Sequence, residues 1–154
     1  MSKVKIVDKD KGYKALVKRV YGMGKPTVSV GILEAEGAQE AAGSNITIAE
    51  LAAIHEFGLG VPERSFLRAW FDQNEDRARS FVTELLKAVV KGKYSKEQAL
   101  ELLGTKLQAE IQARISAGID PANAPSTIAR KGSATPLIDT GQLRSSMSYK
   151  VGSK

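Results

Sequence analysis

Apolar residues recur at the spacing of an amphipathic helix in three long stretches of the chain. Within residues 10–21 they stand at Tyr13, Leu16, Val17 and Val20, on one helical face. Residues 66–91 carry a second stripe, formed by Leu67, Trp70, Phe71, Asn74, Ala78, Phe81, Val82, Leu85 and Val89. Residues 95–117 carry a third, formed by Ala99, Leu102, Leu103, Leu107, Ile111 and Ile115. Because few residues separate the last two helices, they are predicted to pack antiparallel as a hairpin.

Local capping signals predict where the helices begin and end. Thr47 with Glu50, and Ser95 with Gln98, have the spacing of a capping box, so each pair is predicted to start a helix. Asp139 or Thr140 is expected to cap a short helix over residues 141–147. The glycines expected to end helices are Gly22, Gly24, Gly58 and Gly118.

Two short segments favour strands. Residues 27–33, read TVSVGIL, are rich in β-branched side chains, and residues 147–151 alternate between apolar and polar positions. These segments are predicted to pair with each other. Residues 34–45 contain small side chains and glycines and are predicted to form an exposed, mobile loop. Residues 119–139 contain Pro121, Pro125 and Pro136 and are predicted to form an irregular arm.

These elements predict a single α+β domain spanning residues 1–154. A long antiparallel helical hairpin would pack on a small antiparallel sheet, with an extended Pro-rich arm at residues 119–139. A chain of 154 residues is long enough to bury an ordinary core. It has no cysteine, which excludes disulfides and Cys-based metal sites. Its longest apolar runs fall well short of the roughly 20 residues of a membrane span.

The net charge of +6 is distributed in blocks along the chain. Residues 1–25 carry eight basic and two acidic groups, whereas residues 26–63 carry six glutamates and no basic group. Alternating blocks suit subunits that recognise one another, and they are equally typical of solvated faces. The positive net charge also keeps a small basic nucleic-acid-binding protein as the alternative function.

The N-terminus lacks the apolar stretch of a secretory signal, so we expect a protein made and kept in the cytoplasm.

No residue pattern predicts catalysis, a cofactor or a metal site. The string GMGKPT at residues 22–27 lacks the spacing of a phosphate-binding loop. His55 is the sole histidine, with leucine at position 59, so it is interpreted as a hydrogen-bonded structural residue rather than a metal ligand.

A group of aromatic residues, Trp70, Phe66 and Phe71, stands near Arg64 and Arg68 in the sequence. Such a mixture of aromatic and basic side chains could stack bases. The helical stripe favours a core position for Trp70 and Phe71, while Phe66 lies off the stripe.

Two stretches of the chain carry a series of short motifs in a fixed order. The first stretch, residues 48–74, contains His55-Glu56-Phe57-Gly58 followed by Pro62-Glu63-Arg64-Ser65-Phe66-Leu67. The second, residues 119–151, contains Pro125-Ser126-Thr127-Ile128 with Lys131-Gly132, then Pro136-Leu137-Ile138-Asp139-Thr140-Gly141 with Leu143-Arg144. Together these stretches resemble the neck and tail-completion proteins of tailed bacteriophages, a group that includes minor tail components and the virion-morphogenesis proteins of Mu-like phages.

The resemblance implies a structural subunit with no enzymatic role, located in the virion at the head–tail junction. It implies a homo-oligomer, a sixfold ring, in contact with a tail terminator or tail-tube protein and with a head-side connector or stopper, around a channel that holds DNA. It implies no membrane and no cofactor. The residues expected at partner interfaces are Arg64, Phe66, Arg68, Thr127, Arg130, Lys131, Leu143 and Arg144.

Overall fold

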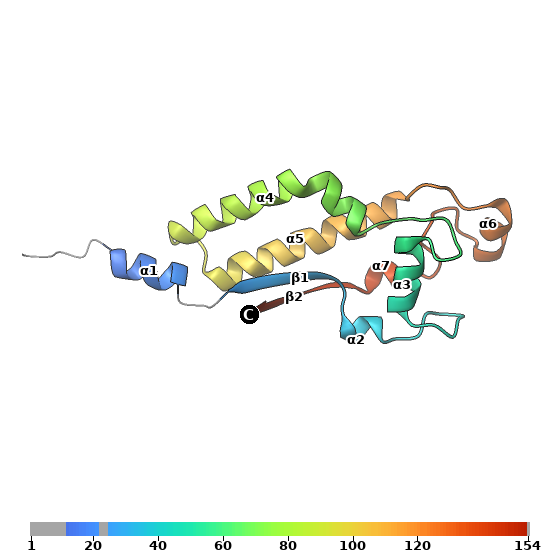
Figure 1. Ribbon diagram of the computed structural model, residues 1–154, viewed down its shortest axis with the longest axis horizontal. Coiled ribbons are helices and arrows are strands. Elements are labelled where there is room, and N and C mark those ends of the chain that lie inside the picture. The colour runs from blue at the N-terminus through green and yellow to red at the C-terminus, as the bar shows by residue number, and fades with distance from the viewer. Residues whose placement is uncertain (1–11, 22–24, 154) are drawn as a thin grey trace, which may run out of the picture.

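The computed structural model describes residues 12–21 and 25–153, and it confirms the α+β class (Figure 1). The elements are α1 (Tyr13–Tyr21), β1 (Pro26–Ile32), α2 (Glu34–Gly37), α3 (Ile48–Phe57), α4 (Arg68–Val90), α5 (Lys96–Ala117), α6 (Pro125–Lys131), α7 (Gln142–Ser145) and β2 (Met147–Ser153). In the part of the chain that is described, no helix is both long and apolar enough to span a membrane. The glycines at 22 and 24, expected to end the first helix, lie outside the described residues.

Helices α4 and α5 form the predicted antiparallel hairpin, which runs along the length of the molecule (Figure 1). The 23 residues of α4 correspond to about 34 Å of helix. The predicted capping box opens α5: the Ser95 hydroxyl accepts from the backbone N–H of Gln98, whose side chain accepts from the backbone N–H of Ser95. Gly118 follows the end of α5, as predicted.

The two strands pair antiparallel, as predicted, and pack against α5. Val28 lies opposite Val151 and Val30 opposite Tyr149. The Tyr149 ring lies directly against Gly104 of α5, where a Cβ atom would stand 2.2 Å from the ring Cδ2 atom. The absence of a side chain at this helical position lets the sheet approach the helix closely. The Tyr149 hydroxyl also forms hydrogen bonds with two side chains of α5. It donates to the Glu101 carboxylate at 2.6 Å and accepts from the Thr105 hydroxyl at 3.1 Å.

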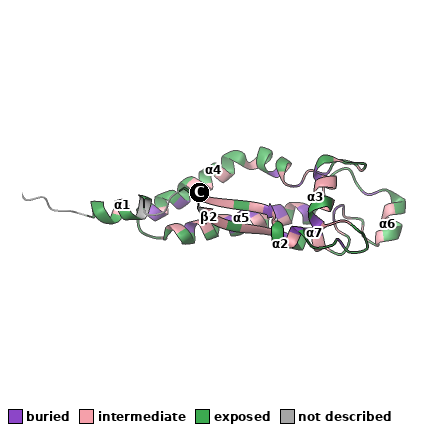
Figure 2. Cartoon of the chain, turned by 60° about the horizontal axis from the view of Figure 1, so that its bottom comes forward, coloured by how far each residue is buried: buried purple, intermediate pink, exposed green. Residues whose placement is uncertain are grey.

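The main core lies between α3, α5, the sheet and the segments around α7, and Figure 2 shows its buried residues in purple along the interior. Ile48, Ile111, Ile115 and Met147 are the largest fully buried side chains. A smaller cluster, built on Leu85, Val89 and Ala99, closes the hairpin near its loop. By contrast, none of the α6 residues is buried.

Two segments predicted as irregular contain regular structure. Residues 34–45 include α2, and Ala41 is buried while its backbone N–H donates to the Ile46 carbonyl. The expected loop therefore folds back against the start of α3. Within residues 119–139 the helix α6 forms, because Pro125 stands in its first turn, where a missing N–H costs no helical hydrogen bond.

The cap expected for the last helix was also wrong. Gly141, with a φ of 81°, is the N-cap of α7 in place of Asp139 or Thr140. The Thr140 hydroxyl still accepts from the backbone N–H of Gln142, at 3.3 Å.

Candidate functional site

The first motif stretch folds into a helix, a tight turn and the start of the next helix. The capping box of Thr47 and Glu50 opens α3, as predicted. Gly58 ends α3 in the left-handed region, with a φ of 67°, and a Cβ there would lie 3.0 to 3.1 Å from atoms of Glu63. The turn sends the chain back along α3, so that the backbone N–H of Arg64 donates to the His55 carbonyl at 2.8 Å.

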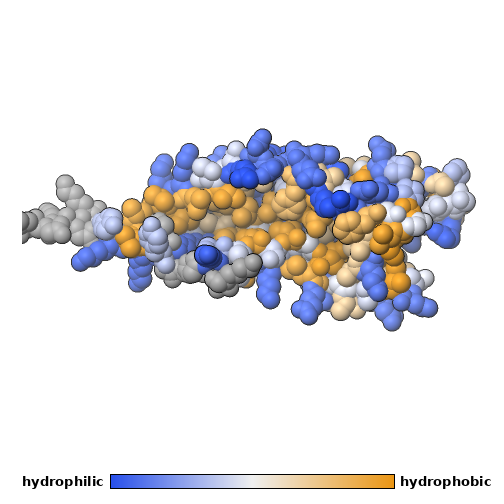
Figure 3. Space-filling model, in the orientation of Figure 1, coloured by the Kyte–Doolittle hydropathy of each residue, from blue (hydrophilic) through white to orange (hydrophobic). Residues whose placement is uncertain are grey.

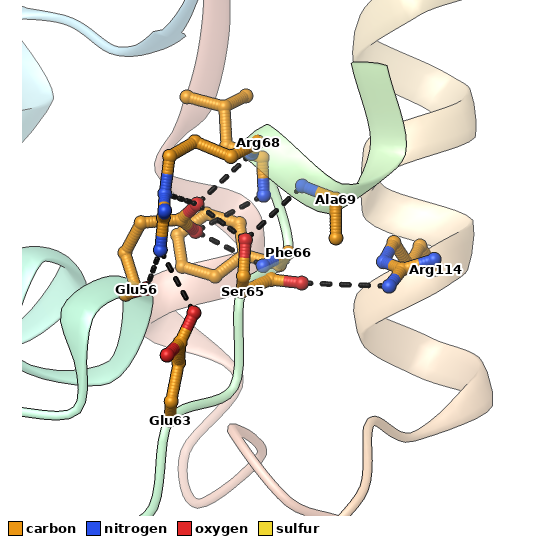
Figure 4. Close-up of polar contacts among 8 residues, drawn as sticks. Glu56, Glu63, Ser65, Phe66, Arg68, Ala69 and Arg114 are labelled. Carbon is orange, nitrogen blue, oxygen red and sulfur yellow. Dashed lines mark hydrogen bonds and ion pairs between the residues drawn. The ribbon is translucent and has the colours of Figure 1, made fainter. Parts of the chain in front are cut away.

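The carboxylate of Glu56 organises the start of α4 (Figure 4). One oxygen accepts from the backbone N–H groups of Phe66 and Leu67, and the other from the backbone N–H of Arg68 and the Ser65 hydroxyl, all at 2.7 to 3.1 Å. These are N–H groups that a helix start leaves without intrahelical partners. Leu67, the N-cap of α4, makes no side-chain cap bond in the structure described. Glu56 therefore caps α4 from the neighbouring helix.

Arg68 completes this arrangement. Its guanidinium bonds the Glu56 carboxylate through Nε at 3.2 Å, and through Nη2 it bonds the Glu56 carbonyl at 2.7 Å and the Glu63 carboxylate at 2.9 Å. The group also lies 4.7 Å from the centre of the Phe57 ring. Arg68 is thus half-exposed but already engaged within the subunit.

The pKa of the Glu56 carboxyl is set by two opposing effects. Burial raises it, but the hydrogen bonds from Ser65, Arg68, Leu67 and Phe66 lower it more, so the pKa lies below its ordinary value. In the unfolded chain the value returns to about 4.3. The contribution of the ionised group to stability is therefore fully present above the unfolded pKa and is lost as the pH falls through the folded pKa.

Acid is expected to reduce the stability difference between the wild type and Glu56→Gln. At neutral pH the wild type should be the more stable protein, because an amide replaces one of the two acceptor oxygens with a donor. Below pH 4 the difference should shrink as Glu56 itself takes up a proton. Urea unfolding of both proteins from pH 7 to pH 2.5 measures it. A difference that stays constant or grows in acid would contradict this account of the carboxylate.

Arg64 connects the first motif stretch to the second. Its side chain is only 7% exposed, and its Nε and Nη2 donate to the carbonyls of Pro121 and Ala122 at 2.8 and 3.3 Å. Gln142 makes a second connection, because its side-chain amide donates to the Glu40 carbonyl at 3.0 Å and accepts from the backbone N–H of Ala42 at 2.8 Å. Segments about 60 and 100 residues apart in sequence are thereby held at one end of the molecule.

A cavity of about 840 Å³ lies at this end, between α3, α6, α7 and the turns that connect them. His55, Arg64, Arg130 and Lys131 line it, and Asp139 is its acidic residue. The lining also includes apolar side chains, namely Ile46, Leu51, Ile54, Val61, Pro62 and Leu137. The arrangement offers a basic, partly apolar recess to which both motif stretches contribute.

The imidazole of His55 faces this recess without a hydrogen-bond partner for Nδ1, which is buried, among the residues that the structure describes. The expectation that His55 is hydrogen-bonded is therefore wrong for its Nδ1 atom. Burial lowers the pKa of His55, and the positive charges of Arg64 and Lys131 lower it further. His55 is consequently neutral at pH 7.

Lys131→Gln is expected to raise the pKa of His55 toward its ordinary value, because one of the two cations that lower it is removed. As the sole histidine of the chain, His55 gives ring proton signals in the NMR spectrum that need no further assignment. The exposed α4 residue Lys87 provides a matched control, since Lys87→Gln removes the same charge outside the cavity. Equal His55 titration curves in Lys131→Gln and wild type would show that the lysine does not act on the imidazole.

The eight residues expected at partner interfaces fall into different environments. Five line the cavity, namely Arg64, Thr127, Arg130, Lys131 and Leu143. Phe66, Leu143 and Arg64 are 2%, 4% and 7% exposed, so these three are buried within the subunit. Arg144 is exposed and donates to the Ser116 hydroxyl at 3.2 Å. The partner contacts of all eight residues stay a prediction.

Most of the aromatic surface that could stack bases is buried. Trp70 and Phe66 are 4% and 2% exposed. Phe71, which was expected in the core, is 39% exposed, and its ring stands nearly perpendicular to that of Trp70 with centroids 4.9 Å apart. Two of the three aromatic faces are therefore covered by protein. The described residues also contain no cluster of three or more His, Asp or Glu side chains suited to a metal ion.

Sequence reasoning missed the roles of Glu56 and Gln142, whose partners lie far along the chain. The spacing of Glu56 from Ser65 and Arg68 matches no recognised capping pattern, because the donors lie outside the helix that carries Glu56.

Comparisons of the chain with protein-family models, with curated proteins and with solved structures found no match.

Proposed function

We propose that this chain is a structural virion protein, a ring-forming tail-completion or neck subunit at the head–tail junction of a tailed phage or prophage, with no catalytic role. The observation that carries the proposal is the pair of chemically different uncovered surfaces at separate places on the subunit. Head-to-tail contacts that close into a ring need two such surfaces. The order and spacing of the motifs, which resemble those of tail-completion proteins, support the assignment to a head–tail junction.

The first surface is apolar and lies on the hairpin near its loop. Leu86 and Val90, one turn apart on α4, are 61% and 46% exposed, and Leu102 of α5 is 42% exposed. Figure 3 shows the apolar side chains, in orange, over the C-terminal half of α4. Exposed apolar side chains grouped in this way are typical of protein interfaces.

The sheet, which packs on α5, offers unpaired backbone as well. It has two strands among the described residues, so each strand has an edge without a partner strand. Strand β1 carries no charged side chain within its bounds, although charges are the usual protection of an exposed edge. Two-stranded sheets are marginal on their own, and pairing with a neighbouring subunit would extend this one.

The second surface is the basic recess at the other end of the molecule, lined by Arg130 and Lys131. In the proposed assembly, copies of the chain form a sixfold ring, and the ring contacts a tail terminator or tail-tube protein on one side and a connector or stopper on the other. The channel of such a ring surrounds DNA.

Inactivating the gene in the phage or prophage that encodes this chain is the test of the function. We expect filled heads and finished tails that fail to join, and we expect the wild-type gene supplied in trans to restore tailed particles. Electron microscopy of the lysates counts free heads, free tails and complete particles. Tailed particles in normal number without the gene would contradict the proposal.

A further inference from the structure

The cavity described above contains more positive than negative side chains. Arg64 is 93% buried, and its hydrogen bonds go to two carbonyl groups, which carry no formal charge. Arg130 and Lys131 line the same cavity, and none of the three cations has a carboxylate within 4.0 Å among the residues described. Buried charges in proteins are normally paired. Of the three cations only Arg64 is buried, and Asp139 is the one acidic residue in the lining, so the cavity carries a net positive charge.

The walls of the cavity define what kind of anion fits. Ile46, Leu51, Ile54 and Val61 supply apolar surface beside the cations. The volume of about 840 Å³ lies in the range of sites for organic ligands, far above the size of an inorganic ion. His55 also lines the cavity, and its buried Nδ1 has no hydrogen-bond partner among the residues described.

We propose that this cavity binds a peptide segment of a partner protein that carries carboxylate groups next to apolar side chains. The carboxylates would meet Arg130 and Lys131 at the mouth and the buried guanidinium of Arg64, and the apolar side chains would cover Ile54 and Val61. This inference rests on the proposed function, in which this end of the subunit faces other virion proteins.

Two synthetic hexapeptides with fluorescein labels test the proposal on the full-length protein. One alternates leucine with glutamate, and the other alternates leucine with glutamine. Fluorescence anisotropy at low salt should show the glutamate peptide binding at least about tenfold more tightly, because only its carboxylates form charge-assisted hydrogen bonds with the cations. The NMR titration of His55 should show its pKa rising when the peptide is bound, because an anion favours the imidazolium.

A pair of variants locates the binding. Arg130→Gln with Lys131→Gln should weaken binding of the glutamate peptide at least about tenfold. Lys87→Gln with Lys91→Gln removes the same charge from two exposed positions that do not line the cavity, one on α4 and one at its C-cap, and should leave the affinity unchanged. Arg64 is kept in both, because it also holds the backbone of Pro121 and Ala122.

Several outcomes would overturn the proposal. These are equal affinity for both peptides, equal affinity of both double variants, no binding up to about 1 mM peptide, or tighter binding of inorganic phosphate or of a short DNA duplex. Assembly state is measured separately by sedimentation on the same samples. If the protein forms rings but does not bind the peptide, only the proposed binding site is contradicted. If it binds the peptide but never assembles, only the proposed function is contradicted.

Discussion

Replacing Glu56 by alanine is expected to lower the free energy of unfolding by about 3–5 kcal/mol. The substitution leaves the backbone N–H groups of Phe66, Leu67 and Arg68 without their acceptor, and it removes one of the two carboxylates that pair with the Arg68 guanidinium. At about 2–4 °C per kcal/mol for a chain of this size, the melting temperature should fall by about 10 °C. Differential scanning calorimetry and urea unfolding measure both quantities.

The matched control for this prediction is Glu63→Ala. Glu63 also bonds Arg68, but its side chain is 58% exposed and it accepts no backbone N–H of α4. Its removal should change the free energy of unfolding by less than about 1 kcal/mol, as for an exposed ion pair. Similar losses in the two variants would mean that the charge near Arg68, and not the cap on α4, stabilises this region.

Gly104→Ala is expected to destabilise the protein by about 1–3 kcal/mol, as overpacked core positions do. Alanine in place of glycine within a helix ordinarily stabilises it by about 1 kcal/mol, so the predicted sign is opposite to that of an uncrowded helical site. The reason is the Tyr149 ring, three atoms of which would lie 2.2 to 2.7 Å from the new Cβ. Either the ring or β2 must move away from α5.

A double-mutant cycle isolates this contact. In a Tyr149→Ala background the ring is absent, and Gly104→Ala should become neutral or stabilising by up to about 1 kcal/mol. Urea unfolding of the four proteins gives the coupling energy. If Gly104→Ala stabilises the chain equally with and without the tyrosine, the close approach of α5 and β2 is not a determinant of this fold.

Features that depend on neighbouring residues were predictable from the sequence. The capping boxes of Thr47 with Glu50 and of Ser95 with Gln98 formed as predicted, because donor and acceptor are three residues apart and need no tertiary structure. The hairpin of α4 and α5 followed from two long stripes and a short connection. The pairing of β1 with β2 followed from the scarcity of other strand-like segments.

Contacts of single side chains with distant residues were not predictable. Glu56 appears in the sequence as an ordinary helical glutamate, and its role arises only when the turn at Gly58 brings Phe66 to Arg68 against it. Arg64 appears as a surface charge, yet it is buried because the carbonyls of Pro121 and Ala122 satisfy it. The cavity likewise requires the packing of both motif stretches, so spacing alone could not reveal it.

Electron microscopy of the purified full-length protein, with sedimentation velocity over a range of concentrations, tests the central claim most directly. The account predicts closed rings with a central channel, formed by head-to-tail contact of identical subunits. Particles that remain monomers at every concentration would contradict it.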